Sequence, residues 1–381
     1  MRNLFVLLAL VPCFLTAFGQ SIALKKEYPN ATFLKEAIPI ADGYLVAGYR
    51  SRIEKQGNAQ MRYYSPFVAR LDAKMKTRWE KKFPESKYWP LRSIVAANGG
   101  YYVLGDNGFV DHNGAKTARL IKLSPEGRIV FEKLYPYPGM HSGEGVAMVG
   151  LPNGDLLARI DLFSRASAVE APRILRLNAR GEKIWDRPLL GDHFKYYPQR
   201  FILDHRGRLV LVGVAYRSRE DFNRSRSRGW VRVIDPEHPT KIIAERFYDE
   251  FKGLEFTDAM ELSSGGWWIL GNAHDDKYGA RRYAVLLELD ANGKVIEQRR
   301  YEHEHQLALD AFCWNPKRNQ LVMVGRMMER RSPPRSAMYT VDQNWDLKRD
   351  TIGDPGFYHQ VSAFDGGELF VVKQKGLMVM E

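Results

Sequence analysis

Residues Ser93–Tyr135 read SIVAANGGYYVLGDNGFVDHNGAKTARLIKLSPEGRIVFEKLY, and this stretch decides the fold. Two runs of aromatic and branched residues, Ser93–Ala97 and Tyr101–Gly105, flank a tight Asn-Gly-Gly turn. Two more runs, Ala118–Leu123 and Arg128–Tyr135, flank Ser-Pro-Glu-Gly. Aromatic and branched residues favour strands, and Pro followed by Gly is typical of a turn. The stretch therefore predicts one four-stranded antiparallel unit.

The second strand of this unit recurs along the chain at intervals of roughly 50 to 60 residues, which is the spacing of propeller blades. Its copies begin at Gly43, Gly100, Gly154, Arg208, Gly266, Gln320 and Glu368. We therefore expect an all-β fold, a seven-bladed β-propeller of four-stranded antiparallel blades. The last unit shows three strands, and Ile22–Tyr28 is similar to the fourth strands. We expect this N-terminal strand to close the ring, which removes free sheet edges.

A second pattern marks the turns between third and fourth strands. Its fullest copies are Leu71-Asp72 with Trp79, Leu177-Asn178 with Gly181 and Trp185, and Leu289-Asp290 with Gly293. With these residues the chain resembles exported bacterial β-propeller proteins whose blades carry an L-D-x-x-G-x-x-x-W-x-K pattern. The resemblance implies the fold and no particular activity, because these are turn and packing residues. Trp79, Phe131 and Trp185 are expected to pack between blades.

The N-terminal segment predicts a signal peptide spanning residues 1–19. Arg2 precedes an apolar run that extends through Phe18, and Ala17 and Gly19 are the small residues that favour cleavage before Gln20. A retained anchor and a lipoprotein attached through Cys13 are the alternatives. We expect residues 20–381 to form a single propeller domain that is periplasmic or secreted, monomeric and without a transmembrane segment.

The charge balance points to an acidic partner. The chain holds 57 Lys+Arg against 45 Asp+Glu, a formal net charge of +12. A basic surface favours an acidic protein, an anionic glycan or lipid head groups, and export argues against nucleic acid.

One face of the predicted propeller carries the longer loops. The loops that join strands two and three are long, starting with about Tyr49–Ser65, whereas the turns on the opposite face are short. Binding usually occurs on long loops held by a rigid scaffold. The candidate ligand-binding residues are loop arginines and the aromatic residues of the loops that join blades: Arg217, Arg219, Arg330, Arg331, Trp89, Tyr137, Tyr197 and Tyr358. Solvated loops and packing between blades are the alternatives.

Polar residues near the starts of the first strands predict a mixed-charge ring around the central channel. They are Glu36, Arg92, Glu144, Arg200, Asp258, Asp310 and His359. In an enzyme, Glu144, Asp258, Asp310 and His359 would supply acid and base groups, and the alternative is a hydrated structural ring. His303 and His305 are weak metal candidates without diagnostic spacing. We expect no cofactor and no metal.

Three functions remain open from the sequence. The favoured one is a non-catalytic recognition module that binds an acidic protein or an anionic glycan through the long-loop face, for example an inhibitor or immunity-type protein. The second is a glycan lyase or hydrolase with its site at the mouth of the central channel. The third is an envelope scaffold.

Overall fold

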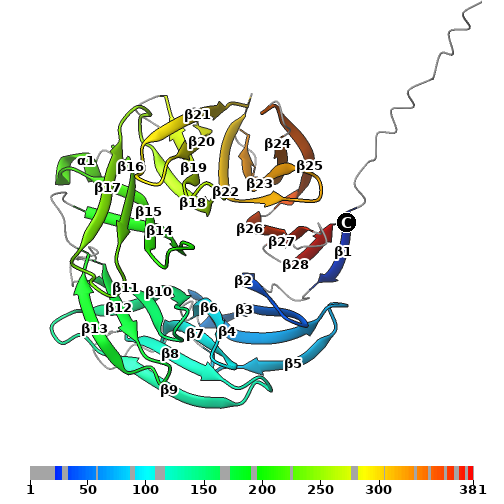
Figure 1. Ribbon diagram of the computed structural model, residues 1–381. Helices are drawn as coiled ribbons and strands as arrows, with labels where there is room; N and C mark the ends of the chain where they lie inside the picture. The colour runs from blue at the N-terminus through cyan, green and yellow to red at the C-terminus, as the bar shows by residue number, and fades with distance from the viewer. Residues whose placement is uncertain are drawn as a thin grey trace, which may run out of the picture.

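The chain folds as an all-β β-propeller. A computed structural model describes residues 22–27, 33–56, 59–85, 91–107, 116–163, 172–189, 195–223, 226–275, 282–303, 305–329, 333–341, 345–355, 358–363, 369–373 and 376–380. The strands form four-stranded antiparallel sheets around a central axis, and the first strands lie nearest that axis (Figure 1). None of the helical segments in this described part has the length and apolar character that a membrane crossing needs.

Six blades are each formed by four consecutive strands of the described chain. The first three comprise β2 (Phe33–Ile40), β3 (Gly43–Gln56), β4 (Ala59–Asp72) and β5 (Thr77–Lys82); β6 (Leu91–Ala97), β7 (Gly100–Asp106), β8 (Ala118–Leu123) and β9 (Ile129–Tyr135); and β10 (Ser142–Gly150), β11 (Leu156–Phe163), β12 (Arg173–Leu177) and β13 (Lys183–Pro188). The next three comprise β14 (Lys195–Leu203), β15 (Leu209–Tyr216), β16 (Arg228–Ile234) and β17 (Ile242–Tyr248); β18 (Glu255–Glu261), β19 (Trp267–His274), β20 (Arg282–Leu289) and β21 (Val295–Tyr301); and β22 (Gln306–Asn315), β23 (Gln320–Met328), β24 (Arg335–Val341) and β25 (Leu347–Pro355). The short helix α1 (Arg219–Asn223) lies between β15 and β16.

A further four-stranded sheet combines the two ends of the described chain. It contains β26 (Tyr358–Ala363), β27 (Leu369–Lys373), β28 (Gly376–Met380) and β1 (Ile22–Glu27), and β1 pairs with β28 as the sequence predicts. This sheet lies beside the first blade, and two hydrogen bonds connect them. The Gln360 side-chain amide accepts the N–H of Ala37 (3.0 Å) and donates to the Ala37 carbonyl (2.7 Å). The expected seven units are thus six blades of consecutive strands and this composite sheet.

Burial explains why the second strands are so apolar. Every residue of β7 is buried, and β11 and β15 are buried along all but their last residue. These strands lie in the middle of a sheet that has a neighbouring blade on each face, so both of their faces need apolar side chains. The residues of the outermost strand β9 are instead exposed or partly buried, apart from its last residue, Tyr135.

The recurring Asp or Asn closes the turn between the third and fourth strands. The Asp290 carboxylate accepts from the backbone N–H groups of Asn292 and Lys294, both at 2.8 Å. Asn178 makes the same two contacts with Arg180 and Glu182, both at 2.9 Å. The turn pattern of the sequence therefore has a local physical cause.

The aromatic residues of the fourth strands pack between blades, which confirms that prediction. Trp79 donates its indole N–H to the Pro125 carbonyl of the next blade (2.7 Å), and a Cβ on Gly127 would lie 2.8 Å from its ring. Gly181 similarly lies against Phe131 of the preceding blade. Trp185 packs against the core that its blade shares with the fourth blade.

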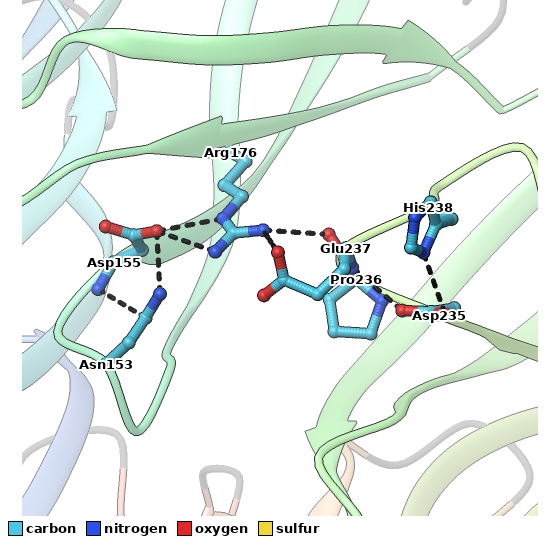
Figure 2. Close-up of polar contacts among 7 residues, drawn as sticks. All are labelled: Asn153, Asp155, Arg176, Asp235, Pro236, Glu237 and His238. Carbon is cyan, nitrogen blue, oxygen red and sulfur yellow. Dashed lines mark hydrogen bonds and ion pairs between the residues drawn. The ribbon is translucent and has the colours of Figure 1, made fainter.

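Polar contacts add a second link between the third and fourth blades (Figure 2). Arg176 of β12 donates to Asp155 of its own blade at 2.9 Å. It also pairs with Glu237, which lies in the connection between β16 and β17. Because Arg176 is almost fully buried, this connection is held against the neighbouring blade.

The prediction of a loop at Tyr49–Ser65 is wrong. β3 and β4 continue as a two-stranded ribbon, with pairs that run from Gly43 with Asp72 to Gln56 with Ala59. Ion pairs hold this ribbon against the end of the blade. Arg50 pairs with Glu80 of β5 (2.8 Å), and Arg52 pairs with Glu85 (2.8 Å). The polar composition of this stretch concealed the strand pairing.

Candidate binding site around the propeller axis

Each first strand places its polar residues at a register shift. In β2 the shift lies between Leu34 and Glu36, and equivalent shifts occur in the first strand of every sheet of the described chain. An extra residue at such a bulge turns the strand and redirects its side chains. The first strands therefore direct neighbouring polar residues in different directions around the axis.

The predicted ring is not one column, and this corrects the sequence alignment. Glu36, Arg200 and Asp258 directly follow the shift in their strands. Arg92, Asp310 and His359 are the extra residues at the shift, and Glu144 precedes it. Alternation in a sequence cannot reveal a bulge, because the extra residue changes the face of everything that follows.

We call these side chains, apart from His359, and the charged residues that interact with them the axial cluster, which contains three separate sets of ion pairs. It consists of Lys35, Glu36, Arg92, Lys116, Glu144, Arg200, Asp258, Asp310 and Arg326. Glu144 is held by Arg92 (2.9 Å) and Lys116 (2.6 Å). Arg200 pairs with Asp258 at 3.0 Å, and Arg326 lies 4.0 Å from Asp310. The cluster holds five basic and four acidic side chains, so it carries both signs of charge with an excess of cations.

Two of the carboxylates also connect neighbouring blades. Asp258 accepts the backbone N–H of Phe312 from the next blade (3.1 Å) in addition to that of Ala259 (2.9 Å). Glu36 accepts the N–H of Ile94 in the same way at 2.7 Å. These carboxylates therefore have a structural part, because they satisfy backbone donors of an adjacent first strand.

Burial shifts the pKa of several members of the axial cluster. Burial raises the pKa of Asp258 and of Glu36, and the charge of Arg200 opposes the rise at both carboxyl groups. Burial and the nearby Arg92 lower the pKa of Lys35. Burial raises the pKa of Asp310 to about 6, against an opposing effect of Arg326. Asp310 thus titrates closer to neutrality than an ordinary aspartate.

In each ion pair of the axial cluster the cation is the more exposed partner. The Arg200 side chain is 45% exposed above Asp258 at 8%, and Arg92 is 27% exposed against 14% for Glu144. Arg326 is 37% exposed and Asp310 25%. In these pairs the carboxylate is thus the more buried partner and the guanidinium group the more solvent-exposed one. An arrangement of this kind fits the binding of anionic groups.

The predicted loop arginines are only partly covered by the structure. Arg217 pairs with Asp249 at 2.9 Å, and Arg228 contacts the same carboxylate. Arg219 is exposed at the first position of α1. Arg330 and Arg331 lie outside the described residues. One carboxylate of the chain itself therefore binds two of the arginines at this edge of the fourth blade.

The predicted aromatic residues occupy different settings. Tyr137 is half-buried and donates its hydroxyl to Asp186 of the next blade (3.0 Å), which is packing between blades. Tyr197 stacks on Phe222 of α1, with ring centroids 6.1 Å apart. Tyr358 belongs to β26, but its side chain, like that of His359, is not described, and Trp89 lies outside the described residues.

The two histidine candidates lie together without a metal-binding set. The His303 and His305 rings are 5.5 Å apart, and Glu329 is 3.8 Å from His305. Within the described ranges, no three His, Cys, Asp or Glu side chains are grouped closely enough to hold a metal ion.

Comparisons with known proteins support the fold alone. No protein family and no curated protein matches the sequence. The structure is similar to YCF48 bound to D1 peptide, with 11% identity over 96% of both chains and a TM-score of 0.54. It is also similar to Drosophila Semaphorin 1a, extracellular domains 1-2, with 8% identity over 95% of this chain and 88% of that one and a TM-score of 0.55. Prolyl oligopeptidase B from Galerina marginata matches at 10% identity over 90% of this chain and 46% of that one, with a TM-score of 0.50. The chain shares the β-propeller fold with these proteins.

Proposed function

We propose that this chain is a non-catalytic recognition module that binds an acidic protein or an anionic glycan. One observation carries the proposal: Arg92, Arg200 and Arg326 of the axial cluster are each more exposed than the carboxylate with which they pair. An approaching anion would meet guanidinium groups that are already oriented, so little ordering would oppose binding. The net charge of +12 favours the same class of partner.

The partner chemistry is a set of several anionic groups on one chain. Arg92, Arg200 and Arg326 come from three different blades, so one ligand with spaced anions would contact several of them. One structural neighbour, YCF48, is bound to a peptide, which makes an acidic peptide segment the first ligand to test. The loop residues Arg217 and Arg219 are proposed as outer contacts on the same ligand.

Binding of defined polyanions tests the proposal. The chain is titrated with a polyglutamate peptide and with a sulfated oligosaccharide at low and moderate salt. Replacing Arg200 and Arg326 by Gln should weaken the binding of either ligand. A charge-matched variant with Arg128→Gln and Arg180→Gln, at exposed turn positions, should bind normally. Affinity that responds to neither salt nor the Arg200 and Arg326 changes would exclude the axial cluster as the binding site.

The alternative function, a glycan lyase or hydrolase, has one observation in its favour. Asp310 has a pKa of about 6 and remains partly exposed, which suits a general acid or base near neutral pH. Glu144 and Asp258 are less suited, because cations or backbone N–H groups already occupy their oxygens. Turnover of an anionic glycan that disappears in Asp310→Asn would favour the enzyme over the recognition module.

We also propose that the composite sheet is the seventh blade of the ring. It contacts β22 and β23 on one side and β2 on the other, and β1 completes it. Deleting residues 21–29 should expose the edge of β28 and cause aggregation or loss of a cooperative melting transition. Unchanged melting of the shortened chain would contradict this closure.

Export remains part of the proposal. Residues 1–19 have the features of a cleaved signal peptide, and the mature chain would act in the periplasm or outside the cell. N-terminal sequencing of the exported protein should give Gln20 as the first residue. A first residue at Met1 would favour a retained anchor.

A further inference from the structure

A separate cavity lies between the outer strands of the third and fourth blades. Its volume is about 290 Å³, near the lower end of the range for small-molecule sites. Ile174, Leu189, Ile234 and Ile242 give it apolar walls, and Arg187 and Thr240 contribute polar groups. None of these residues belongs to the axial cluster.

The cavity owes one wall to a longer connection in the fourth blade. Seven residues separate Ile234 of β16 from Ile242 of β17, whereas five residues separate the corresponding strands of the third and fifth blades. Pro239 and Thr240 line the cavity from this longer connection. A two-residue extension in one blade has thus formed a hollow at this junction.

Internal hydrogen bonds hold this connection in place. The Asp235 carboxylate accepts the N–H of Glu237 (2.9 Å), and the Lys241 N–H donates to the His238 carbonyl (2.8 Å). The connection is also tied to the third blade through Glu237 and Arg176 (Figure 2). The wall of the cavity is therefore set before any ligand enters, which lowers the entropy cost of binding.

The two arginines that line the cavity differ in whether a carboxylate neutralises their charge. Arg232 is buried and paired with Glu245 at 2.5 Å. Arg187 is exposed and donates to the carbonyl of Asp186 (3.2 Å), and within the described part of the chain no carboxylate contacts its guanidinium. The Asp186 carboxylate is instead bound by Arg173 at 2.6 Å. One unneutralised positive charge therefore stands at the edge of an apolar cavity.

We propose that this cavity binds a small amphiphilic carboxylate, a molecule with an apolar chain and a single anionic head. The chain would lie between the isoleucine walls, and the carboxylate would pair with Arg187. The size of the cavity favours a short acyl chain over a protein segment. The site is independent of the proposed function, because it uses none of the residues around the axis.

Titration of the full chain with octanoate tests this site, with octan-1-ol as the uncharged probe. Octanoate should bind saturably at one site and more tightly than octan-1-ol. Arg187→Gln should weaken octanoate binding about threefold, because an ion pair at an exposed position is lost. Thr240→Trp should block binding, since it fills the cavity from an exposed position with little effect on folding.

Two charge-matched variants separate this site from others. Arg180→Gln is exposed in the turn before β13 and outside the cavity lining, and it should leave octanoate binding unchanged. Arg200→Gln should also leave it unchanged, which excludes the axial cluster as the place of binding. Absence of saturable binding would overturn the proposal, as would equal affinities for octanoate and octan-1-ol. Full affinity in either Arg187→Gln or Thr240→Trp, with melting unchanged, would do the same.

Discussion

Two arginine–carboxylate networks in this propeller are built in opposite senses. In the network of Figure 2, the Arg176 side chain is 7% exposed and its partner Glu237 is 59% exposed. In the axial cluster, Arg200 is 45% exposed and lies above Asp258 at 8%. A buried guanidinium that bonds to two blades acts as a cross-link, whereas an exposed guanidinium held by a buried acid can bind a further anion. The same pair of residue types therefore links two blades in one region and, in the function we propose, binds an anion in the other.

The largest expected effect is the loss of the buried cross-link. Arg176→Met should lower the free energy of unfolding by about 3 kcal/mol, because it leaves the partly buried Asp155 without its cationic partner. Chemical denaturation measures the change, and Arg180→Met is the matched control at an exposed position. The affinity for polyanions should stay the same. A variant with normal stability and impaired binding would reverse the roles assigned to the two networks.

Asp310 should make stability depend on pH in a defined direction. Its pKa rises from 3.8 to about 6 on folding, so the folded chain binds this proton more tightly than the unfolded chain. The resulting stabilisation is fully present below pH 3.8 and is lost as pH rises through 6. By linkage, the loss at pH 7 is about 2–3 kcal/mol.

The variant Asp310→Asn should remove this dependence. It cannot ionise, so its stability relative to the original chain should increase between pH 4 and pH 7 by about 2 kcal/mol. Urea denaturation at several pH values measures the difference. A gap between the two proteins that does not change with pH would show that Asp310 has an ordinary pKa.

A smaller effect is expected for the exposed arginine of the axial cluster. Arg200→Gln should weaken polyanion binding about tenfold, as expected for one charge-assisted hydrogen bond. Its effect on the free energy of unfolding should be smaller than that of Arg176→Met, because Asp258 keeps its two backbone N–H partners. Calorimetric titration and denaturation of the same variant give both values. Stability loss without weaker binding would assign Arg200 to structure.

The sequence was informative about the fold because the fold depends on local patterns. Apolar second strands, the Asp or Asn turns and the aromatic residues of the fourth strands each have a nearby physical cause. Trp79 and Gly127 show the limit of this locality, since they meet across a blade boundary, and Phe131 and Gly181 make the same contact one unit later. Such contacts are predictable because the unit repeats.

The candidate site was less predictable, because it depends on register and on distant partners. The extra residue in each first strand separates Glu36 and Asp258 from Arg92 and Asp310, although the sequence pattern predicts one ring. Lys116 was missed, although it binds Glu144 from a position 28 residues earlier in the chain. The available signal was that Lys116 is a basic residue just before the third strand of its blade, close to the predicted ring. The sequence pattern does not indicate which residue of an ion pair is the more exposed.

The smallest expected effect links the axial cluster to pH. Below pH 6 Asp310 becomes neutral, which removes a negative charge 4.0 Å from Arg326. At a partly exposed site, one charge at this range is worth about 0.5 kcal/mol, or roughly a twofold change in affinity. A sulfated oligosaccharide, whose own charge is constant, should therefore bind about twofold more tightly at pH 5 than at pH 7. Asp310→Asn isolates this group from titrating histidines, because any response that remains in the variant has another origin. An identical pH response in both proteins would exclude Asp310 from the binding surface, whereas a response confined to the original chain would place it beside the bound anion.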